Sequence, residues 1–157
     1  SDIFADFRPD IFVNCAAYTG VDLAETQRKI ALEVNAKSLN YICKECKKNN
    51  TKLFHFSTDY VFQGNSSKPY QENDEVNPIN YYGFSKLEGE KYIRSLLKKY
   101  IIIRAGWLFG FKGNNFVKTI TKSLIRGNDI RLVSDQLISL TYSNDFAKNL
   151  EEIMQKH

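Results

Sequence analysis

Apolar runs that alternate with helix-type periodicity constrain the fold of this chain more than any other feature. Residues 9–17 and 53–58 are nearly continuous apolar runs, which is typical of strands buried on both faces of a sheet. Two more strands are expected at 100–105 and 129–133. The expected helices cover residues 22–50, 79–97, 114–125 and 143–155, and a polar loop covers 63–77. Strands that alternate with helices predict an α/β fold, a three-layer Rossmann-like parallel sheet with helices on both faces.

Composition narrows the class of protein. The 157 residues are 43% hydrophobic and 25% charged, which suits one globular domain. The net charge of +4 comes from scattered lysines, so we expect no nucleic-acid partner. No apolar run approaches the roughly 20 residues that a membrane span needs, so we expect no membrane partner. The chain starts at Ser1 without a methionine, and we interpret it as a fragment of a longer protein.

The three cysteines are Cys15, Cys43 and Cys46, an odd number that argues against a disulfide framework. Cys43 and Cys46 lie in the middle of an expected helix rather than at its start, which is unlike a redox motif. The two histidines are far away in sequence, so no zinc site is predicted. Reduced thiols indicate the cytoplasm, and we expect no metal.

Tyr82 and Lys86 lie one helical turn apart in the expected helix 79–97. They share one stripe with the apolar side chains of this helix. The stripe consists of Ile79, Gly89, Ile93, Leu96 and Leu97. A lysine that faces inward needs a partner for its charge. We expect its ammonium group to lower the pKa of the Tyr82 phenol from about 10, which would make the tyrosine an acid–base catalyst.

Polar or small residues follow three of the expected strands, at positions 14–18, 57–60 and 106–110. Ligands bind at the carboxyl ends of the strands in such sheets, so these ends should line one crevice. A hydroxyl from Thr58 or Ser57 could hold a substrate oxygen against Tyr82. Such a site suits carbonyl reduction or alcohol oxidation, with hydride supplied by a cofactor. The small side chains of Ala16 and Ala17 would let a flat cofactor approach.

These motifs resemble the dTDP-4-dehydrorhamnose reductases, members of the extended short-chain dehydrogenase/reductase superfamily. The matching stretches, in family order, are residues 9–22, 34–36, 57–62, 77–90, 104–110, 113–119 and 135–136. The blocks Ser57-Thr58-Asp59-Tyr60-Val61-Phe62 and Asn114-Asn115-Phe116 are the most specific. The resemblance implies a single partial NAD(P)-binding Rossmann-type domain over residues 1–157. It also implies reduction of the C4 ketone of a dTDP-4-keto-6-deoxysugar with NADPH or NADH, in dTDP-L-rhamnose biosynthesis.

The resemblance implies a catalytic role for three residues. Tyr82 would donate a proton to the C4 oxygen of the sugar, and Thr58 would supply the hydroxyl of the triad. Lys86 would hold the nicotinamide ribose and lower the pKa of Tyr82. Tyr82 and Lys86 would thus also bind the cofactor, whose other expected contacts are Ala16, Ala17 and Tyr18.

The nucleotide-sugar substrate would contact Thr58, Asp59, Trp107 and Asn115. For Trp107, a core aromatic is an equally good interpretation. Asn115, with Asn114, should cap a helix and shape the substrate loop. Asn35, inside a helix, is interpreted as structural rather than catalytic. A homodimer is left open.

Three departures from the family pattern stand out. The chain lacks the strand and glycine-rich turn that hold the pyrophosphate, and the cluster Gly106, Gly110 and Gly113 is a decoy that carries large aromatics. The C-terminal segment that completes the sugar-nucleotide pocket is absent, and Leu137–Thr141 lacks the usual glycine and proline. We therefore expect the fragment alone to be inactive. Two alternatives stay open: a non-catalytic regulatory subunit of the methionine adenosyltransferase type, or another extended-type nucleotide-sugar epimerase or dehydratase.

Overall fold

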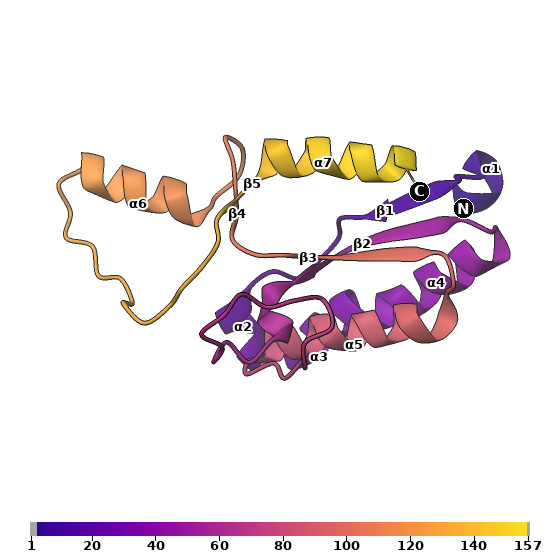
Figure 1. The fold of residues 1–157 in the computed structure, drawn as a ribbon, viewed down its shortest axis with the longest axis horizontal. Coiled ribbons are helices and arrows are strands. Elements are labelled where there is room, and N and C mark those ends of the chain that lie inside the picture. Colours follow the sequence, from indigo (N-terminus) through magenta and orange to yellow (C-terminus); the bar gives the residue numbers. More distant parts are fainter. Residues whose placement is uncertain (1–2, 157) are drawn as a thin grey trace. The chain divides into compact units, whose positions relative to one another are not determined.

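The computed structural model describes residues 3–156 and contains two compact units, Ser1–Arg104 and Ala105–His157. The first unit is built on a three-stranded sheet in the order β1 (Ile11–Asn14), β2 (Lys52–Thr58) and β3 (Tyr100–Ala105) (Figure 1). β1 and β2 are parallel, with Asn14 opposite His55. Strands in sequential order, joined by helical crossovers, form one half of a Rossmann-type sheet, so the predicted fold class is confirmed.

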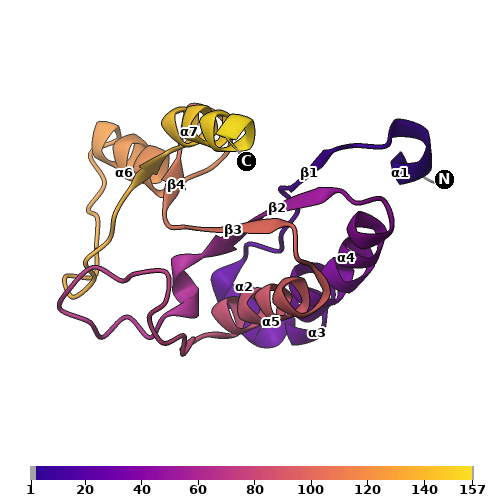
Figure 2. The ribbon, with the colours of Figure 1, turned by 45° about the vertical axis from the view of Figure 1, so that its right-hand side comes forward.

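The helices of the first unit lie between the strands in sequence. The short α1 (Ile3–Phe7) precedes β1. The β1–β2 crossover holds α2 (Val21–Thr26), α3 (Arg28–Leu32), the π-helical η1 (Glu33–Lys37) and α4 (Ser38–Lys48). The β2–β3 crossover holds the 3₁₀ turn η2 (Asp59–Val61) and α5 (Tyr81–Leu96). α4 and α5 lie side by side against the same face of the sheet (Figures 1 and 2). The single helix expected over 22–50 is therefore interrupted, first at Gln27 and then by the π turn.

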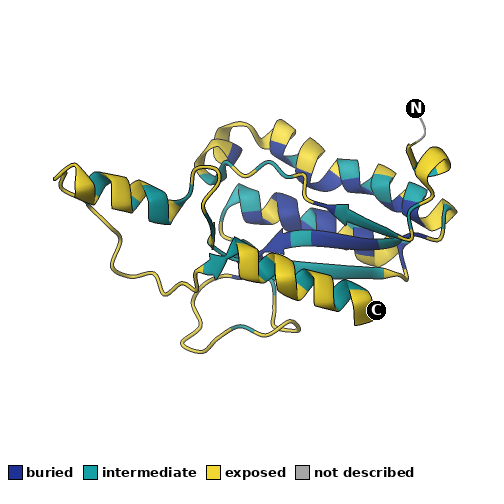
Figure 3. Cartoon of the chain, turned by 90° about the horizontal axis from the view of Figure 1, so that it is seen from above, coloured by how far each residue is buried: buried dark blue, intermediate teal, exposed yellow. Residues whose placement is uncertain are grey.

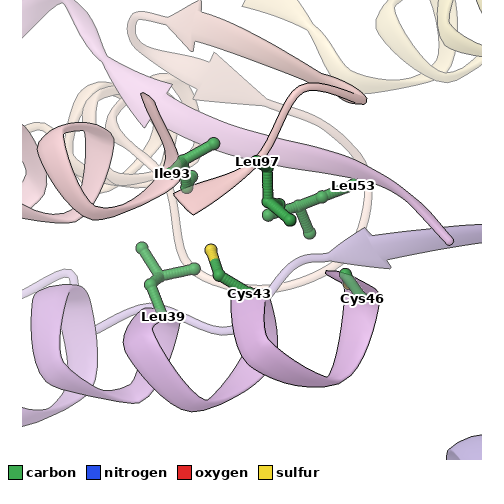
Figure 4. Packing of buried hydrophobic residues seen from close by; sticks show 6 residues of the cluster. All are labelled: Leu39, Cys43, Cys46, Leu53, Ile93 and Leu97. Atoms are coloured by element: carbon green, nitrogen blue, oxygen red, sulfur yellow. The ribbon is translucent and has the colours of Figure 1, made fainter. Parts of the chain in front are cut away.

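Burial is concentrated in β2 and in the helices that pack on it (Figure 3). One cluster joins α4, β2 and the end of α5, as Figure 4 shows: Leu39, Cys43, Cys46, Leu53, Ile93 and Leu97. Burial raises the pKa of Cys43 to about 12 and that of Cys46 to about 11, so both thiols stay protonated and inert. All three cysteines are free, which confirms the interpretation as ordinary reduced thiols.

Two predictions about strand and helix limits are wrong. β1 covers only Ile11–Asn14, and its first three residues are half-buried, because it lies at one edge of the three-stranded sheet. α5 begins at Tyr81, because the Asn80 side chain accepts a hydrogen bond from the Gly83 backbone N–H at 2.7 Å and caps the helix. Ile79 thus precedes the helix and is 75% exposed, so it is not part of the buried stripe.

α5 approaches its neighbours closely at two glycines. A Cβ on Gly83 would lie 2.1 Å from the Tyr60 carbonyl oxygen, and one on Gly89 would lie 2.3 Å from the Asn35 carbonyl oxygen. Both distances are far below van der Waals contact. The glycines therefore let the helix rest on η2 and η1, and this contact places the residues between them.

The second unit contains β4 (Leu108–Phe109) paired in parallel with β5 (Thr141–Tyr142), together with α6 (Phe116–Ile125) and α7 (Ser143–Lys156). The strand expected at 129–133 is wrong, since these residues are irregular and Val133 is 67% exposed. β-structure depends on a pairing partner, and here β4 pairs with Thr141–Tyr142 instead. Gly127 (φ 69°) ends α6 as predicted. None of the helices in residues 3–156 has the length and apolarity needed to cross a membrane.

Candidate active site

Thr58, Asp59 and Tyr82 come together where β2 ends and α5 begins. The Thr58 hydroxyl donates to Asp59 Oδ1 at 3.0 Å and accepts from the Tyr60 backbone N–H at 3.2 Å, which caps η2. The Tyr60 ring packs edge-on against the Tyr82 ring, with 5.9 Å between centroids. Burial raises the pKa of the Tyr82 phenol, and its hydrogen bond with the Thr58 side chain partly opposes this effect. The structure thus unites three of the predicted site residues around one phenol.

Lys86 is 1% exposed and points from α5 into the sheet. Its Nζ donates to the Phe56 carbonyl oxygen at 2.5 Å and lies 3.3 Å from His55 Nε2. Burial lowers the pKa of Lys86 to about 8, although the Glu90 carboxylate raises it. The predicted lowering of the Tyr82 pKa by Lys86 is wrong for this structure. Lys86 Nζ binds the Phe56 carbonyl of β2 instead, and desolvation is the largest influence on the pKa of Tyr82.

His55 is a buried polar residue that the sequence interpretation missed. Its Nδ1 lies 3.1 Å from Asn14 Nδ2, across the β1–β2 pair. Burial and the nearby Lys86 lower the pKa of His55 to about 3, so its ring is neutral at ordinary pH. The sequence did hold a signal for His55. Leu53, His55 and Ser57 are spaced two residues apart, and residues with this spacing share one face of a strand. That face carries α4 and α5.

Glu90 forms a second buried polar cluster beside the site. Its Oε1 accepts from the Ser57 hydroxyl at 2.6 Å and from Arg104 Nε at 3.0 Å, and its Oε2 accepts from Arg104 Nη2 at 2.7 Å. Burial alone would raise the pKa of Glu90, but hydrogen bonds from Arg104 and Ser57 hold it below the usual value. Because Ser57 binds Glu90, the hydroxyl beside Tyr82 belongs to Thr58. The sequence could have revealed this buried carboxylate, because Glu90 lies four residues after Lys86 and therefore on the same face of the helix.

The loop after β1 carries the residues predicted to line a cofactor. Ala16 is exposed, and Ala17 and Tyr18 are half-buried. Asn35 holds this loop: its Oδ1 accepts from the Tyr18 N–H at 2.8 Å, and its Nδ2 donates to the Tyr18 carbonyl at 3.0 Å and to Ser85 Oγ at 2.9 Å. All polar atoms of the Asn35 side chain are thus used within the protein, which agrees with a structural role. Parallel pairing puts this loop and Thr58 at the same edge of the sheet.

Trp107 and Asn115, the other predicted substrate contacts, belong to the second unit. Trp107 has φ 47°, which is unusual for a bulky residue, and its ring packs edge-on against Phe116 with 4.9 Å between centroids. Asn115 caps α6: its Oδ1 accepts from the Lys118 N–H at 3.0 Å, and its Nδ2 donates to the Gly110 carbonyl at 2.9 Å. The cap is confirmed, and the substrate contacts of both residues stay predictions.

Comparison with known proteins adds an independent line of evidence. A family described as "RmlD substrate binding domain" matches residues 1–157. A dTDP-4-dehydrorhamnose reductase from Aggregatibacter actinomycetemcomitans is 41% identical over 154 residues, which are 98% of this chain and 52% of the relative. The chain therefore spans about half the length of such relatives.

Solved structures agree in fold. The crystal structure of a dTDP-4-dehydrorhamnose reductase from Bacillus anthracis in complex with NADP is 39% identical, with a TM-score of 0.94 over 98% of this chain and 54% of that chain. A UDP-N-acetylglucosamine 4-epimerase from Methanobrevibacter ruminantium is 20% identical, with a TM-score of 0.81 over 94% of this chain and 52% of that chain, and shares the fold alone. This chain therefore belongs to the RmlD substrate binding domain family.

Proposed function

We propose that this chain carries the proton-transfer half of an NAD(P)H-dependent reductase that acts on the C4 ketone of a dTDP-4-keto-6-deoxysugar. The observation that carries the proposal is the Thr58–Tyr82 pair beside a buried Lys86, at the carboxyl end of β2. A relative named dTDP-4-dehydrorhamnose reductase, 41% identical over 98% of this chain, supports the substrate class.

Tyr82 serves as the proton donor in this proposal. Because its pKa is raised by burial, the phenol stays protonated at neutral pH, as a donor to a developing alkoxide must be. Thr58 lies beside it and would hold the same substrate oxygen through its hydroxyl. Asp59, whose Oδ1 accepts a hydrogen bond from the Thr58 hydroxyl, would bind a sugar hydroxyl beside it.

A bound nicotinamide cofactor supplies the hydride in this reaction class. Ala16 and Ala17 fit such a group, because small side chains at a strand end leave room for a flat ring. Tyr18 would line the same edge, and Lys86 would turn its ammonium group toward the ribose hydroxyls. NADP in the Bacillus anthracis relative supports NADPH as the cofactor. Trp107 and Asn115 would contribute to the sugar-nucleotide side. A homodimer and a cytoplasmic location stay predictions, and no nucleic-acid or membrane partner is proposed.

Tyr82→Phe in the full-length protein tests this assignment. A general acid contributes about 10²–10⁴-fold to rate, so NADPH oxidation with a dTDP-4-keto-6-deoxysugar should fall by that factor while NADPH affinity is retained. The matched control is Tyr92→Phe, on the same helix and away from Thr58, which should keep full activity. Turnover retained in Tyr82→Phe would refute the role of Tyr82. Product analysis separates a 4-reduced sugar from the epimer or dehydrated sugar that the alternatives predict.

A further inference from the structure

A buried hydrogen-bond chain links β1, β2 and α5 behind the candidate site. Asn14 Nδ2 lies 3.1 Å from His55 Nδ1, and His55 Nε2 lies 3.3 Å from Lys86 Nζ. The three residues are 6%, 1% and 1% exposed, so water does not compete for these bonds. At the far end, Lys86 Nζ donates to the Phe56 carbonyl oxygen. At the near end, Asn14 Oδ1 accepts from the Ala16 backbone N–H at 3.2 Å.

With the Asn14 amide in the orientation of this structure, the donors and acceptors along this chain allow only one protonation pattern. Because Asn14 Oδ1 binds the Ala16 N–H, the Asn14 amide presents its NH₂ group to His55 Nδ1, which must accept. A neutral imidazole then carries its proton on Nε2. That N–H faces Lys86 Nζ, and an ammonium group has three donors and no acceptor. The arrangement is therefore satisfied when Lys86 is a neutral amine, which accepts from His55 and donates to the Phe56 carbonyl.

An ammonium group on Lys86 requires the opposite pattern. His55 Nε2 must then offer its lone pair to Nζ, and the ring proton moves to Nδ1. The Asn14 amide must turn over so that its oxygen accepts from Nδ1. This rotation takes the acceptor away from the Ala16 N–H, which is at the loop predicted to line the cofactor. The first pattern satisfies every group along the chain, whereas the second leaves the Ala16 N–H facing the Asn14 NH₂ group. Mixed patterns also place two donors or two acceptors face to face between the side chains.

We propose that His55 is a positioning residue for Lys86, and that its ring tautomer follows the charge of Lys86: Nε2–H opposite the amine, Nδ1–H opposite the ammonium. The Asn14 amide acts as the second switch element. Through these two residues the charge of Lys86 becomes linked to the backbone of the Ala16 loop. The consequence for cofactor binding rests on the proposed function, whereas the tautomer coupling does not.

Burial and the surrounding charges together set the pH range in which Lys86 changes its charge. His55 faces Lys86 from β2, Glu90 lies one turn after it on α5, and Tyr82 lies one turn before it. Glu90 is itself paired with Arg104 of β3, and Asp59 lies beside Tyr82. Burial lowers the pKa of Lys86 to about 8, with Glu90 opposing, and holds that of His55 near 3. The His55 ring thus stays neutral while Lys86 changes charge.

Nitrogen-15 NMR of the histidine rings in this 157-residue chain tests the coupling. The chain has two histidines, so His157→Gln assigns the signals of His55. We expect the protonated ring nitrogen of His55 to move from Nδ1 to Nε2 as the pH rises, with the same midpoint as the ¹³Cε signal of Lys86. A His55 ring that keeps one tautomer while Lys86 titrates overturns the proposal, and so does a ring that becomes doubly protonated in that range.

Three variants sharpen the test. Lys86→Met removes the titrating group, so His55 should keep its Nε2–H tautomer at every pH at which its ring is neutral. His55→Leu should lower the pKa of Lys86, because charge-assisted hydrogen bonds are the stronger ones and the ammonium loses its acceptor. His55→Gln should keep the Lys86 midpoint close to that of the wild type, since an amide can rotate to offer either a donor or an acceptor. An unchanged midpoint in His55→Leu would contradict a positioning role. None of these readouts is enzyme activity, so their failure is distinct from failure of the proposed function.

Discussion

In the variant Gly89→Ala, a gain in helix propensity and a steric clash act in opposite directions, and both have a known size. Alanine is a better helix former than glycine, and helix propensity alone predicts that this change stabilises α5 by about 1 kcal/mol. The structure predicts the opposite. The new methyl group would lie 2.3 Å from the Asn35 carbonyl oxygen and 2.6 Å from Leu39 Cδ1. Since ordinary contact begins near 3.4 Å, α5 would have to move away from η1 by about 1 Å.

The steric cost should exceed the gain in helix propensity. Overpacking a close contact costs about 1–3 kcal/mol and occasionally more, and a backbone carbonyl cannot move aside as a flexible side chain can. Displacing α5 would also stretch the bond of 2.9 Å between Asn35 Nδ2 and Ser85 Oγ, which costs about 1 kcal/mol more. Against the propensity gain, we expect a net loss of about 2 kcal/mol in the free energy of unfolding.

Urea unfolding followed by circular dichroism measures this difference. Lys91→Ala is the matched control, because Lys91 is on the same helix and its side chain is 61% exposed. Its effect should stay within about 0.5 kcal/mol. If Gly89→Ala were as stable as the wild type, or more stable, the close approach of α5 to η1 would be refuted, and with it the placement of the residues between the two glycines of this helix.

Three further predictions follow from the buried polar groups, the thiols and the sequence. Glu90→Gln should destabilise the protein by about 3 kcal/mol, because Arg104 loses its buried partner. In the wild type the lowered pKa of Glu90 means that its contribution is present above pH 4.5 and is lost as pH falls through the folded-state value; unfolding curves of the variant should lack this acid dependence. A thiol reagent should modify Cys15 rapidly in the native chain and leave Cys43 and Cys46 unmodified until unfolding; fast reaction of three thiols would contradict their burial. NADPH titrated into the 157-residue chain should bind only weakly, since the sequence holds no glycine-rich turn for the pyrophosphate; micromolar affinity in calorimetry would refute this.

Local signals in the sequence were enough for much of the fold. β2 and β3 lie at their predicted positions because short apolar runs bounded by polar residues suit buried strands. Asn115 and Gly127 begin and end α6 as predicted, since capping depends on a few adjacent residues. The motif that joins Thr58 to Tyr82 was also visible, because strand end and helix start are both local features.

Tertiary structure alone decided the rest. The segment 129–133 has strand-forming residues, yet it pairs with no strand within residues 3–156, and pairing is a long-range event. The pKa of Tyr82 rises where its nearness to Lys86 predicted a fall, since desolvation depends on everything packed around the phenol. His55 meets Lys86 across 31 residues of sequence. The sequence by itself determined which elements form and which side chains carry the chemistry. Only packing decided their protonation states, because burial and distant partners set the free energy of a charge.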